Sequence, residues 1–318
     1  MEAICADKLS RRYQSKKGIF AKPKSVEALA GLSFRVAQGT VFGLLGQNGA
    51  GKTTTLKILS TLLLPSGGGA TVLGLDVTKD AQQIRSKVSI MFGGERGLYG
   101  RLTGAENLAM FYNLHALPAA DRVARIAQLA AEVDLSDTVL DRPVMTYSRG
   151  MRQKLHLART LLNDPALIFL DEPTIGLDAE AAERFRVMVR DLRDQGRTIV
   201  LTSHYMRDIE ELCDHVVILK DGAAVLDTLY PDLYREKIAN RQLIDLTLHD
   251  RDQAERDGLI RALGKLGARE TSRSGNFRII QARADTGTQS MLTEFEGSIS
   301  NYSARNVSLE DVYLSYVS

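Results

Sequence analysis

Two short segments of the sequence carry residue types able to bind phosphate and to activate water, and the first is GQNGAGKTT. It fits the pattern Gly-x-x-x-x-Gly-Lys-Ser/Thr between a predicted strand and a predicted helix. In such a loop the backbone N–H groups face the phosphates, Lys52 adds a positive charge, and the Thr53 hydroxyl can ligate Mg²⁺. A glycine turn without a ligand is the alternative, and Lys-Thr at the helix start disfavours it. The predicted phosphate-binding residues are Gly46, Gln47, Asn48, Gly49, Ala50, Gly51, Lys52, Thr53 and Thr54.

The second segment is ALIFLDEP, residues 166–173, an apolar run that ends in two acids. Asp171, at the carboxyl end of a predicted strand, can hold Mg²⁺ directly or through water, and Glu172 can accept a proton from an attacking water. A strand that ends in a solvated turn is the ordinary alternative, but an upstream phosphate loop disfavours it. The two segments together indicate nucleotide hydrolysis.

Four segments in a fixed order narrow this prediction. GQNGAGKTT is followed by YSRGMRQKLHLARTLL (147–162), LDEPTIGLD (170–178) and LTSH (201–204). This order resembles the nucleotide-binding subunits of ATP-binding-cassette transporters, and the match spans most of the first 225 residues. The resemblance implies an ATPase that binds ATP together with Mg²⁺. The other histidines show no metal-ligand spacing, so no further metal is expected.

The segment at residues 148–151 corresponds to the family's signature, most often Leu-Ser-Gly-Gly-Gln. Ser148 and Gly150 match it, whereas Tyr147, Arg149 and Met151 depart from it. In the family these residues act on the ATP bound by the opposite subunit, through a hydroxyl and through backbone N–H groups at a helix start. The resemblance therefore implies that two cassettes enclose two ATP molecules.

Three further residues take roles from the resemblance. His204 matches the histidine that contacts the γ-phosphate and holds water and Glu172 in place. Asp178 matches the loop that crosses the dimer interface. Tyr13 stands where the family places an aromatic ring that stacks on adenine, although a single tyrosine can equally be a core residue.

The segment FGGERG, residues 92–97, aligns with the family's coupling loop, in which a glutamine senses Mg²⁺ and the attacking water. The glutamine position falls at Gly94, which has no side chain. Glu95 is the nearest substitute for it, while Arg96 can equally contact a partner.

Short runs rich in Val, Ile and Leu position these segments. They recur at 40–45, 88–92, 166–170, 198–202 and 216–219, and their continuous hydrophobicity is typical of parallel strands buried on both faces. Predicted helices at 53–64, 179–195 and 206–213 lie between them, which indicates an α/β fold with a mostly parallel sheet. A nucleotide-binding domain is expected over residues 1–230, with an inserted helical subdomain at about 95–163 that includes a helix at 119–133.

A small α/β domain is expected over residues 231–318. Alternating or periodic patterns predict strands at 242–249 and 277–284 and helices at 252–266 and 289–295. Ser308 and Asp311 have the spacing of a capping box before a last short helix.

Composition limits the classes of partner. The 318-residue chain has a formal net charge of +2, so it lacks the overall basic excess that would indicate a nucleic-acid partner. Its two cysteines, Cys5 and Cys213, favour a reducing compartment. No apolar run approaches the roughly 20 residues of a membrane span, and the N-terminus lacks the pattern of a secretory signal. The chain is therefore expected at the cytoplasmic face of the membrane, held there by a partner.

The closing SLEDVYL and the segment ERGLYGRLTGAENL resemble ATPases of exporters that pair with a separate permease. The expected partners are an integral-membrane permease and a second cassette, which is either an identical chain or a related one. An importer ATPase and a soluble, mechanical or regulatory cassette ATPase are the alternatives. The lysine-rich loop at 14–25 is either solvated or faces anionic lipid or the permease.

Overall fold

The computed structural model describes residues 1–15, 24–93, 97–239, 241–248, 261, 269–272, 276–282 and 299–317. The chain divides into two compact units, Met1–Tyr230 and Pro231–Ser318. No helix among these described residues is both long enough and apolar enough to cross a membrane.

A six-stranded sheet forms the centre of the first unit, in the order β10-β9-β3-β8-β7-β6. The strands β9, β3, β8, β7 and β6 run parallel, and β10 pairs with β9 antiparallel. Every residue of β3, β7 and β8 is buried, which explains the continuous apolar run within each strand. The predicted α/β fold with a mostly parallel sheet is confirmed. The bounds are β3 Val41–Gly46, β6 Val88–Met91, β7 Leu167–Asp171, β8 Thr198–Ser203, β9 His215–Lys220 and β10 Ala223–Leu229.

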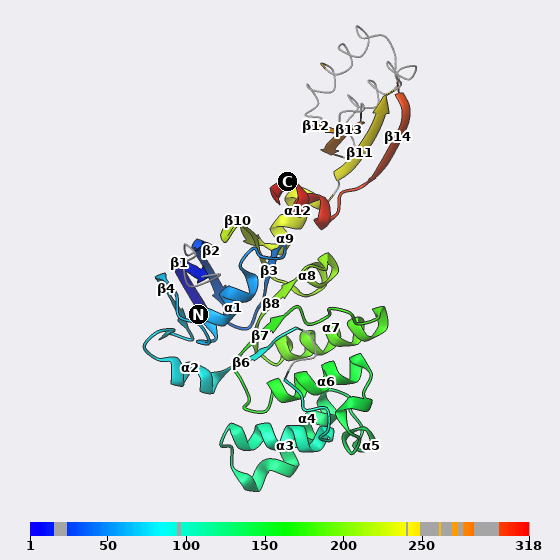
Figure 1. Cartoon of the computed structure of the whole chain (residues 1–318). Helices are drawn as coiled ribbons and strands as arrows, with labels where there is room; N and C mark the ends of the chain where they lie inside the picture. Colours follow the sequence, from blue (N-terminus) through cyan, green and yellow to red (C-terminus); the bar gives the residue numbers. More distant parts are fainter. Residues whose placement is uncertain are drawn as a thin grey trace. The chain divides into compact units, whose positions relative to one another are not determined.

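Helices connect these strands, and four of them, α3 to α6, lie between β6 and β7 in the chain and pack against one another (Figure 1). The bounds are α1 Lys52–Leu59, α2 Ala81–Lys87, α3 Gly104–Leu114, α4 Arg122–Glu132, α5 Asp137–Leu140, α6 Arg149–Thr160, α7 Ala179–Asp194 and α8 Met206–Leu212. Short 3-10 turns occur at Ala119–Asp121 and Val144–Thr146.

Two predicted helices were too long. The helix after the phosphate loop ends at Leu59 because Thr61 has a left-handed backbone, with φ of 62°, and the amides of Leu62 and Leu63 both donate to the Lys57 carbonyl. The helix expected at 119–133 starts only at Arg122, because a 3-10 turn precedes it.

The N-terminal segment forms a second sheet that the sequence did not reveal. Its order is β2-β1-β4-β5, all antiparallel, with bounds β1 Glu2–Ser15, β2 Lys24–Ala37, β4 Gly67–Val72 and β5 Leu75–Asp76. The core of the unit joins both sheets, and the stacked rings of Phe34 on β2 and Phe42 on β3 lie 5.1 Å apart between centroids.

The second unit contains a four-stranded antiparallel sheet in the order β12-β13-β11-β14. The two strands expected at 242–249 and 277–284 are present as β11 and β13, whereas the two helices expected at 252–266 and 289–295 lie outside the described residues, apart from Arg261. The predicted cap before the last helix is formed, because Asp311 N donates to Ser308 Oγ and Ser308 N donates to Asp311 Oδ2. The bounds are α9 Tyr230–Leu233, a π-helical turn Tyr234–Ile238, β11 Arg241–Leu248, β12 Arg269–Ser272, β13 Asn276–Ala282, β14 Ile299–Asn306 and α12 Leu309–Val317.

Candidate active site

The phosphate loop joins β3 to α1, as the sequence predicts, and Lys52 is the first residue of α1. The lysine is 6% exposed, and its Nζ donates to the carbonyl oxygens of Gly46 at 2.7 Å and Gln47 at 3.3 Å. Gly51 precedes it with φ of 106°, and a Cβ there would lie 2.6 Å from the carbonyl oxygen of Ala28, so only glycine fits. The loop therefore holds a buried cation beside the amino end of a helix, which is a site for an anion.

Asp171, the last residue of β7, faces the start of α1. The Thr53 hydroxyl donates to the two carboxylate oxygens of Asp171 at 2.9 and 3.1 Å, and Thr202 Oγ1 donates to one of them at 2.7 Å. Oxygen donors of this kind, few in number and beside a phosphate site, are those that Mg²⁺ uses when phosphate oxygens and water complete its coordination. The residues present therefore fit Mg²⁺, with Thr53 and Asp171 as the groups that would hold it.

Glu172 follows with an unusual backbone, since its φ is 49°. Its amide donates to both oxygens of Thr202, the carbonyl at 3.1 Å and the hydroxyl at 3.0 Å, which fixes the residue against β8. Its carboxylate lies between two groups, with Oε1 3.7 Å from Lys52 Nζ and Oε2 3.5 Å from His204 Nδ1. A non-glycine residue in this conformation costs about 1 kcal/mol or more, and such strain persists where the surroundings fix it.

Tyr13 reaches the phosphate loop from β1. Its Oη lies 3.4 Å from Thr54 Oγ1, and the Arg11 guanidinium carbon lies 4.9 Å from the centre of its ring. The residue is 38% exposed, so it is not one of the buried side chains of the core. The ring therefore presents surface to solvent next to α1.

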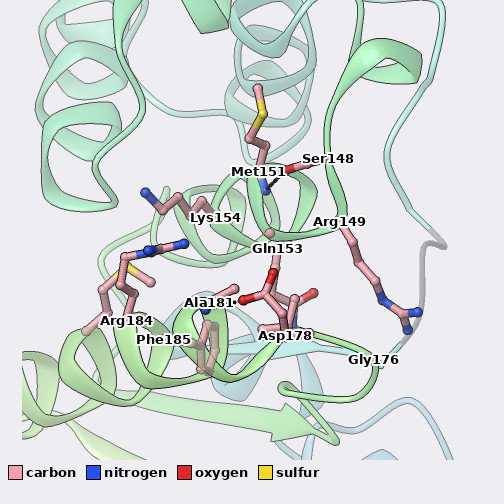
Figure 2. A pocket seen from close by; sticks show the side chains of 13 residues that line it. Ser148, Arg149, Met151, Gln153, Lys154, Gly176, Asp178, Ala181, Arg184 and Phe185 are labelled. Atoms are coloured by element: carbon pink, nitrogen blue, oxygen red, sulfur yellow. Dashed lines mark hydrogen bonds between the residues drawn. The ribbon is translucent and has the colours of Figure 1, made fainter.

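The signature residues form a separate cluster with the loop that ends in Asp178 (Figure 2). A cavity of about 180 Å³ is lined by Ser148, Arg149, Gly150, Met151 and Asp178, among others, and none of the described residues that line it belongs to the phosphate loop. Two helices begin here. Ser148 Oγ caps α6 by accepting from Met151 N at 3.2 Å, and Asp178 Oδ1 caps α7 by accepting from Ala181 N at 2.7 Å.

Arg149, one of the predicted signature residues, extends toward Gly176, as Figure 2 shows. A Cβ on Gly176 would lie 2.2 Å from the guanidinium carbon of Arg149, and Gly176 has φ of 68°. The left-handed backbone thus favours glycine at 176, and a larger residue there would also displace the Arg149 guanidinium.

The structure thus brings together Lys52, Thr53, Asp171, Glu172 and His204, and places residues 148–151 with Asp178 elsewhere on the same unit. Gly94 and Glu95, together with Arg96, lie outside the described residues. So does most of the lysine-rich loop, residues 16–23.

Three residues outside the predicted set also support this site. The Thr202 hydroxyl donates to Asp171 and accepts from the Glu172 amide. Gln153 on α6 donates through Nε2 to the carbonyl of Pro173. Gly93 lies against Asp171, because a Cβ added to Gly93 would be 2.7 Å from the Asp171 carbonyl oxygen. In the sequence these residues are marked only by lying close to the motifs. Their roles could not be predicted, because each contact joins segments that are far apart in the chain.

Comparisons with known proteins identify the family of the chain. Residues 29–175 match the family model described as ABC transporter. The ABC transporter ATP-binding protein NatA of Bacillus subtilis is 39% identical over 228 residues, which cover 72% of this chain and 90% of NatA. The daunorubicin/doxorubicin resistance ATP-binding protein DrrA of Streptomyces peucetius is 34% identical over 303 residues, which cover 93% of this chain and 90% of DrrA.

Among solved structures, a dimer of the ATP-binding cassette MJ0796 bound to ADP and Pi superimposes with a TM-score of 0.64. The two chains are 22% identical, and the match covers 71% of this chain and 98% of that cassette, so it supports the fold. The chain belongs to the ABC transporter family, as an ATP-binding subunit with ATPase activity.

Proposed function

We propose that this chain is the ATPase of an exporter whose membrane path is formed by a separate permease, and that Glu172 is the base that activates water. One observation carries the assignment of Glu172. Its carboxylate lies between the Lys52 ammonium and the His204 ring, at the carboxyl ends of adjacent strands and beside Thr53 and Asp171. A general base must reach the water that it deprotonates, and this position lies next to the phosphate loop.

The residues divide the work as follows. Lys52 and the amides of residues 46–54 bind the β- and γ-phosphates, and the half-exposed ring of Tyr13 stacks on adenine. Thr53 and Asp171 would hold Mg²⁺, which when bound neutralises charge on the phosphates. Glu172 takes the proton from water, and His204 orients that carboxylate and donates to the γ-phosphate.

The separation of the two clusters supports dimerisation. Ser148, Gly150 and Asp178 line a cavity that contains no phosphate-loop residue among its described lining, so they serve an ATP bound by another cassette. A second copy of this chain supplies that site most simply, since each copy carries both clusters. Closure of two copies on two ATP molecules is the motion passed to the permease, and hydrolysis reopens them.

The proposal that transport is directed outward is supported by the names of the relatives. DrrA is named for resistance to daunorubicin and doxorubicin, and its similarity extends over 93% of this chain, beyond the residues that match the family model. We place the chain at the cytoplasmic face of the membrane, attached through the permease, with residues 231–318 as an accessory domain. Gly94 and Glu95 remain the predicted coupling-loop residues.

The test of the active site is Glu172→Gln. The amide cannot accept a proton, so ATP should still bind while turnover falls by about 10²–10⁴-fold. Turnover at the wild-type rate would reject the assignment. Isolation of the complex in mild detergent tests the partner, because the chain should co-purify with a membrane subunit; recovery without any membrane protein would favour a non-transport ATPase.

A further inference from the structure

A buried carboxylate on α8 connects the segments that carry Glu172 and His204. Asp208 is 1% exposed, and its Oδ2 accepts hydrogen bonds from Thr174 Oγ1 at 2.5 Å and from Ser203 Oγ at 2.8 Å. Its Oδ1 accepts from Arg186 Nη1 on α7 at 3.0 Å. One side chain thus joins the segment after β7 at Thr174, the end of β8 at Ser203 and α7 at Arg186.

Two of these partners lie next to the proposed catalytic groups. Thr174 is two residues after Glu172 and is itself 4% exposed, and the turn between them contains the bond from Ile175 N to the Glu172 carbonyl at 3.3 Å. Ser203 immediately precedes His204, and its Oγ also accepts from Tyr205 N at 2.9 Å. The Ser203 hydroxyl, oriented by Asp208, therefore spans the backbone on both sides of His204.

The charge of Asp208 is balanced by Arg186, whose side chain is 4% exposed. The same guanidinium contacts Glu183 Oε2 at 2.8 Å and Glu211 Oε2 at 3.0 Å. Burial alone would lower the pKa of Arg186, but hydrogen bonds to Glu183 and Asp208, with the nearby Glu211, raise it overall. Arg186 is thus a buried cation that pairs with three carboxylates. Of these three, Asp208 is the one that also accepts hydrogen bonds from Thr174 and Ser203.

We infer that Asp208 is a positioning residue that fixes Glu172 and His204 relative to each other by holding Thr174 and Ser203 on one carboxylate oxygen. The inference rests on the proposed function, in which Glu172 is the base. Glu172 adopts a left-handed backbone, which needs such external fixing. Among the described residues, the hydrogen bonds of Asp208 are to Thr174, Ser203 and Arg186 and not to the phosphate loop, so Asp208 acts through the segments it joins.

The main test is ATP hydrolysis by the full-length chain carrying Asp208→Asn. The amide keeps the volume, but it removes the charge and turns one acceptor into a donor that faces either Arg186 or the two hydroxyls. A displacement of about 1 Å in catalytic geometry costs on the order of 10²-fold, so we expect kcat to fall by about 10- to 100-fold. The ADP dissociation constant, measured by calorimetry, should stay within about twofold, because the phosphate loop is not touched.

Glu211→Gln is the matched control. Glu211 lies about one turn later on the same helix and pairs with the same guanidinium, but among the described residues it accepts no hydrogen bond from Thr174 or Ser203. Its kcat should remain close to that of wild type. Equal losses in the two variants would show that only the charge of Arg186 matters, and would overturn the inference.

A double variant separates positioning from a general effect on the fold. If Asp208 acts by positioning Glu172 and His204, Asp208→Asn should slow single-turnover hydrolysis much less in the Glu172→Gln background than in wild type, whereas full additivity would overturn the inference. Wild-type turnover in Asp208→Asn alone, beside a slow Glu172→Gln, rejects the inference and leaves the proposed function intact. Wild-type turnover in Glu172→Gln rejects the proposed function instead.

If Asp208→Asn does not fold, the variants Ser203→Ala and Thr174→Val test the inference instead. Each removes one hydroxyl that donates to Asp208 and leaves the ion pair between Asp208 and Arg186 intact. A lower kcat with unchanged ADP affinity in both supports the inference. Wild-type kcat in both overturns it.

Discussion

Oε2 of Glu172 lies 3.5 Å from Nδ1 of His204, while Oε1 of the same carboxylate lies 3.7 Å from Nζ of Lys52. This convergence follows from strand order, because β8 lies between β3 and β7 and all three run parallel. The carboxyl ends of parallel strands meet at one edge of the sheet, which is where ligands bind in open α/β sheets. The residues just beyond β3, β7 and β8 are therefore neighbours although more than 100 positions separate Lys52 from Glu172.

Replacement of Lys52 tests the phosphate loop. Lys52→Ala removes the buried ammonium that donates to Gly46 and Gln47, so ATP affinity should fall by at least about tenfold, the equivalent of 1.4 kcal/mol. Equilibrium binding of a fluorescent ATP analogue measures this change. Lys57→Ala is the control, because it removes the same charge from the last turn of the same helix and should leave ATP affinity unchanged. Equal affinity in Lys52→Ala and wild type would contradict the phosphate-loop assignment.

The ring of Tyr13 can be tested in the same assay. Tyr13→Phe keeps the aromatic face and loses only the long contact to Thr54 Oγ1, so affinity should be unchanged. Tyr13→Ala removes the face, and base stacking on an aromatic side chain is worth about 1–3 kcal/mol, so affinity should fall by roughly 5- to 150-fold. If adenosine and guanosine triphosphates bind both variants as they bind wild type, the ring does not contact the base.

Gly93→Ala tests the close approach of Gly93, at the start of the predicted coupling loop, to Asp171. A Cβ at this position would lie 2.7 Å from the Asp171 carbonyl oxygen, so either β7 or the loop must move. We expect a loss of about 1–3 kcal/mol in the free energy of unfolding and a lower ATPase rate. Gly69→Ala, where no atom lies within 4 Å of the new Cβ, is the control and should change stability by less than about 0.5 kcal/mol. Chemical denaturation distinguishes the two, and equal stability would show that the loop adapts without strain.

The parts of the fold that were predictable are those in which local pattern and burial coincide. The buried strands β3, β7 and β8 each contain a continuous apolar run, and polar residues occur only at the ends of β7 and β8. The phosphate loop was predictable because its binding groups lie within one short segment of sequence. The N-terminal sheet was not predictable, because register shifts at Ala6/Leu9 and Arg11/Arg12 break the alternation of β1. Asp208 was not predictable either. In the segment MRDIEEL it reads as one acid among several on a helix surface, and its burial depends on Arg186, Thr174 and Ser203.

In the second unit, Asp311 links β14 to α12 and makes stability depend on pH. Its carboxylate accepts from both Nη atoms of Arg305 at 2.6 Å and from Ser308 N at 2.9 Å. Burial alone would raise the pKa of Asp311, but the hydrogen bonds from Arg305 and Ser308 lower it to about 2. Since the folded pKa is below the ordinary value of 3.8, the stabilisation is present above about pH 4 and is lost as the pH falls toward 2.

Asp311→Asn should therefore lower the free energy of unfolding of this unit by on the order of 1–2 kcal/mol at pH 7, and by progressively less as the pH approaches 2. Thermal unfolding of the full chain at a series of pH values measures the difference from wild type. Glu310→Gln removes one negative charge from the same first turn, where the side chain is exposed, and should show a small difference with no such trend. A gap between Asp311→Asn and wild type that stayed constant from pH 7 to pH 3 would mean that the Arg305 pair does not depress the pKa of Asp311.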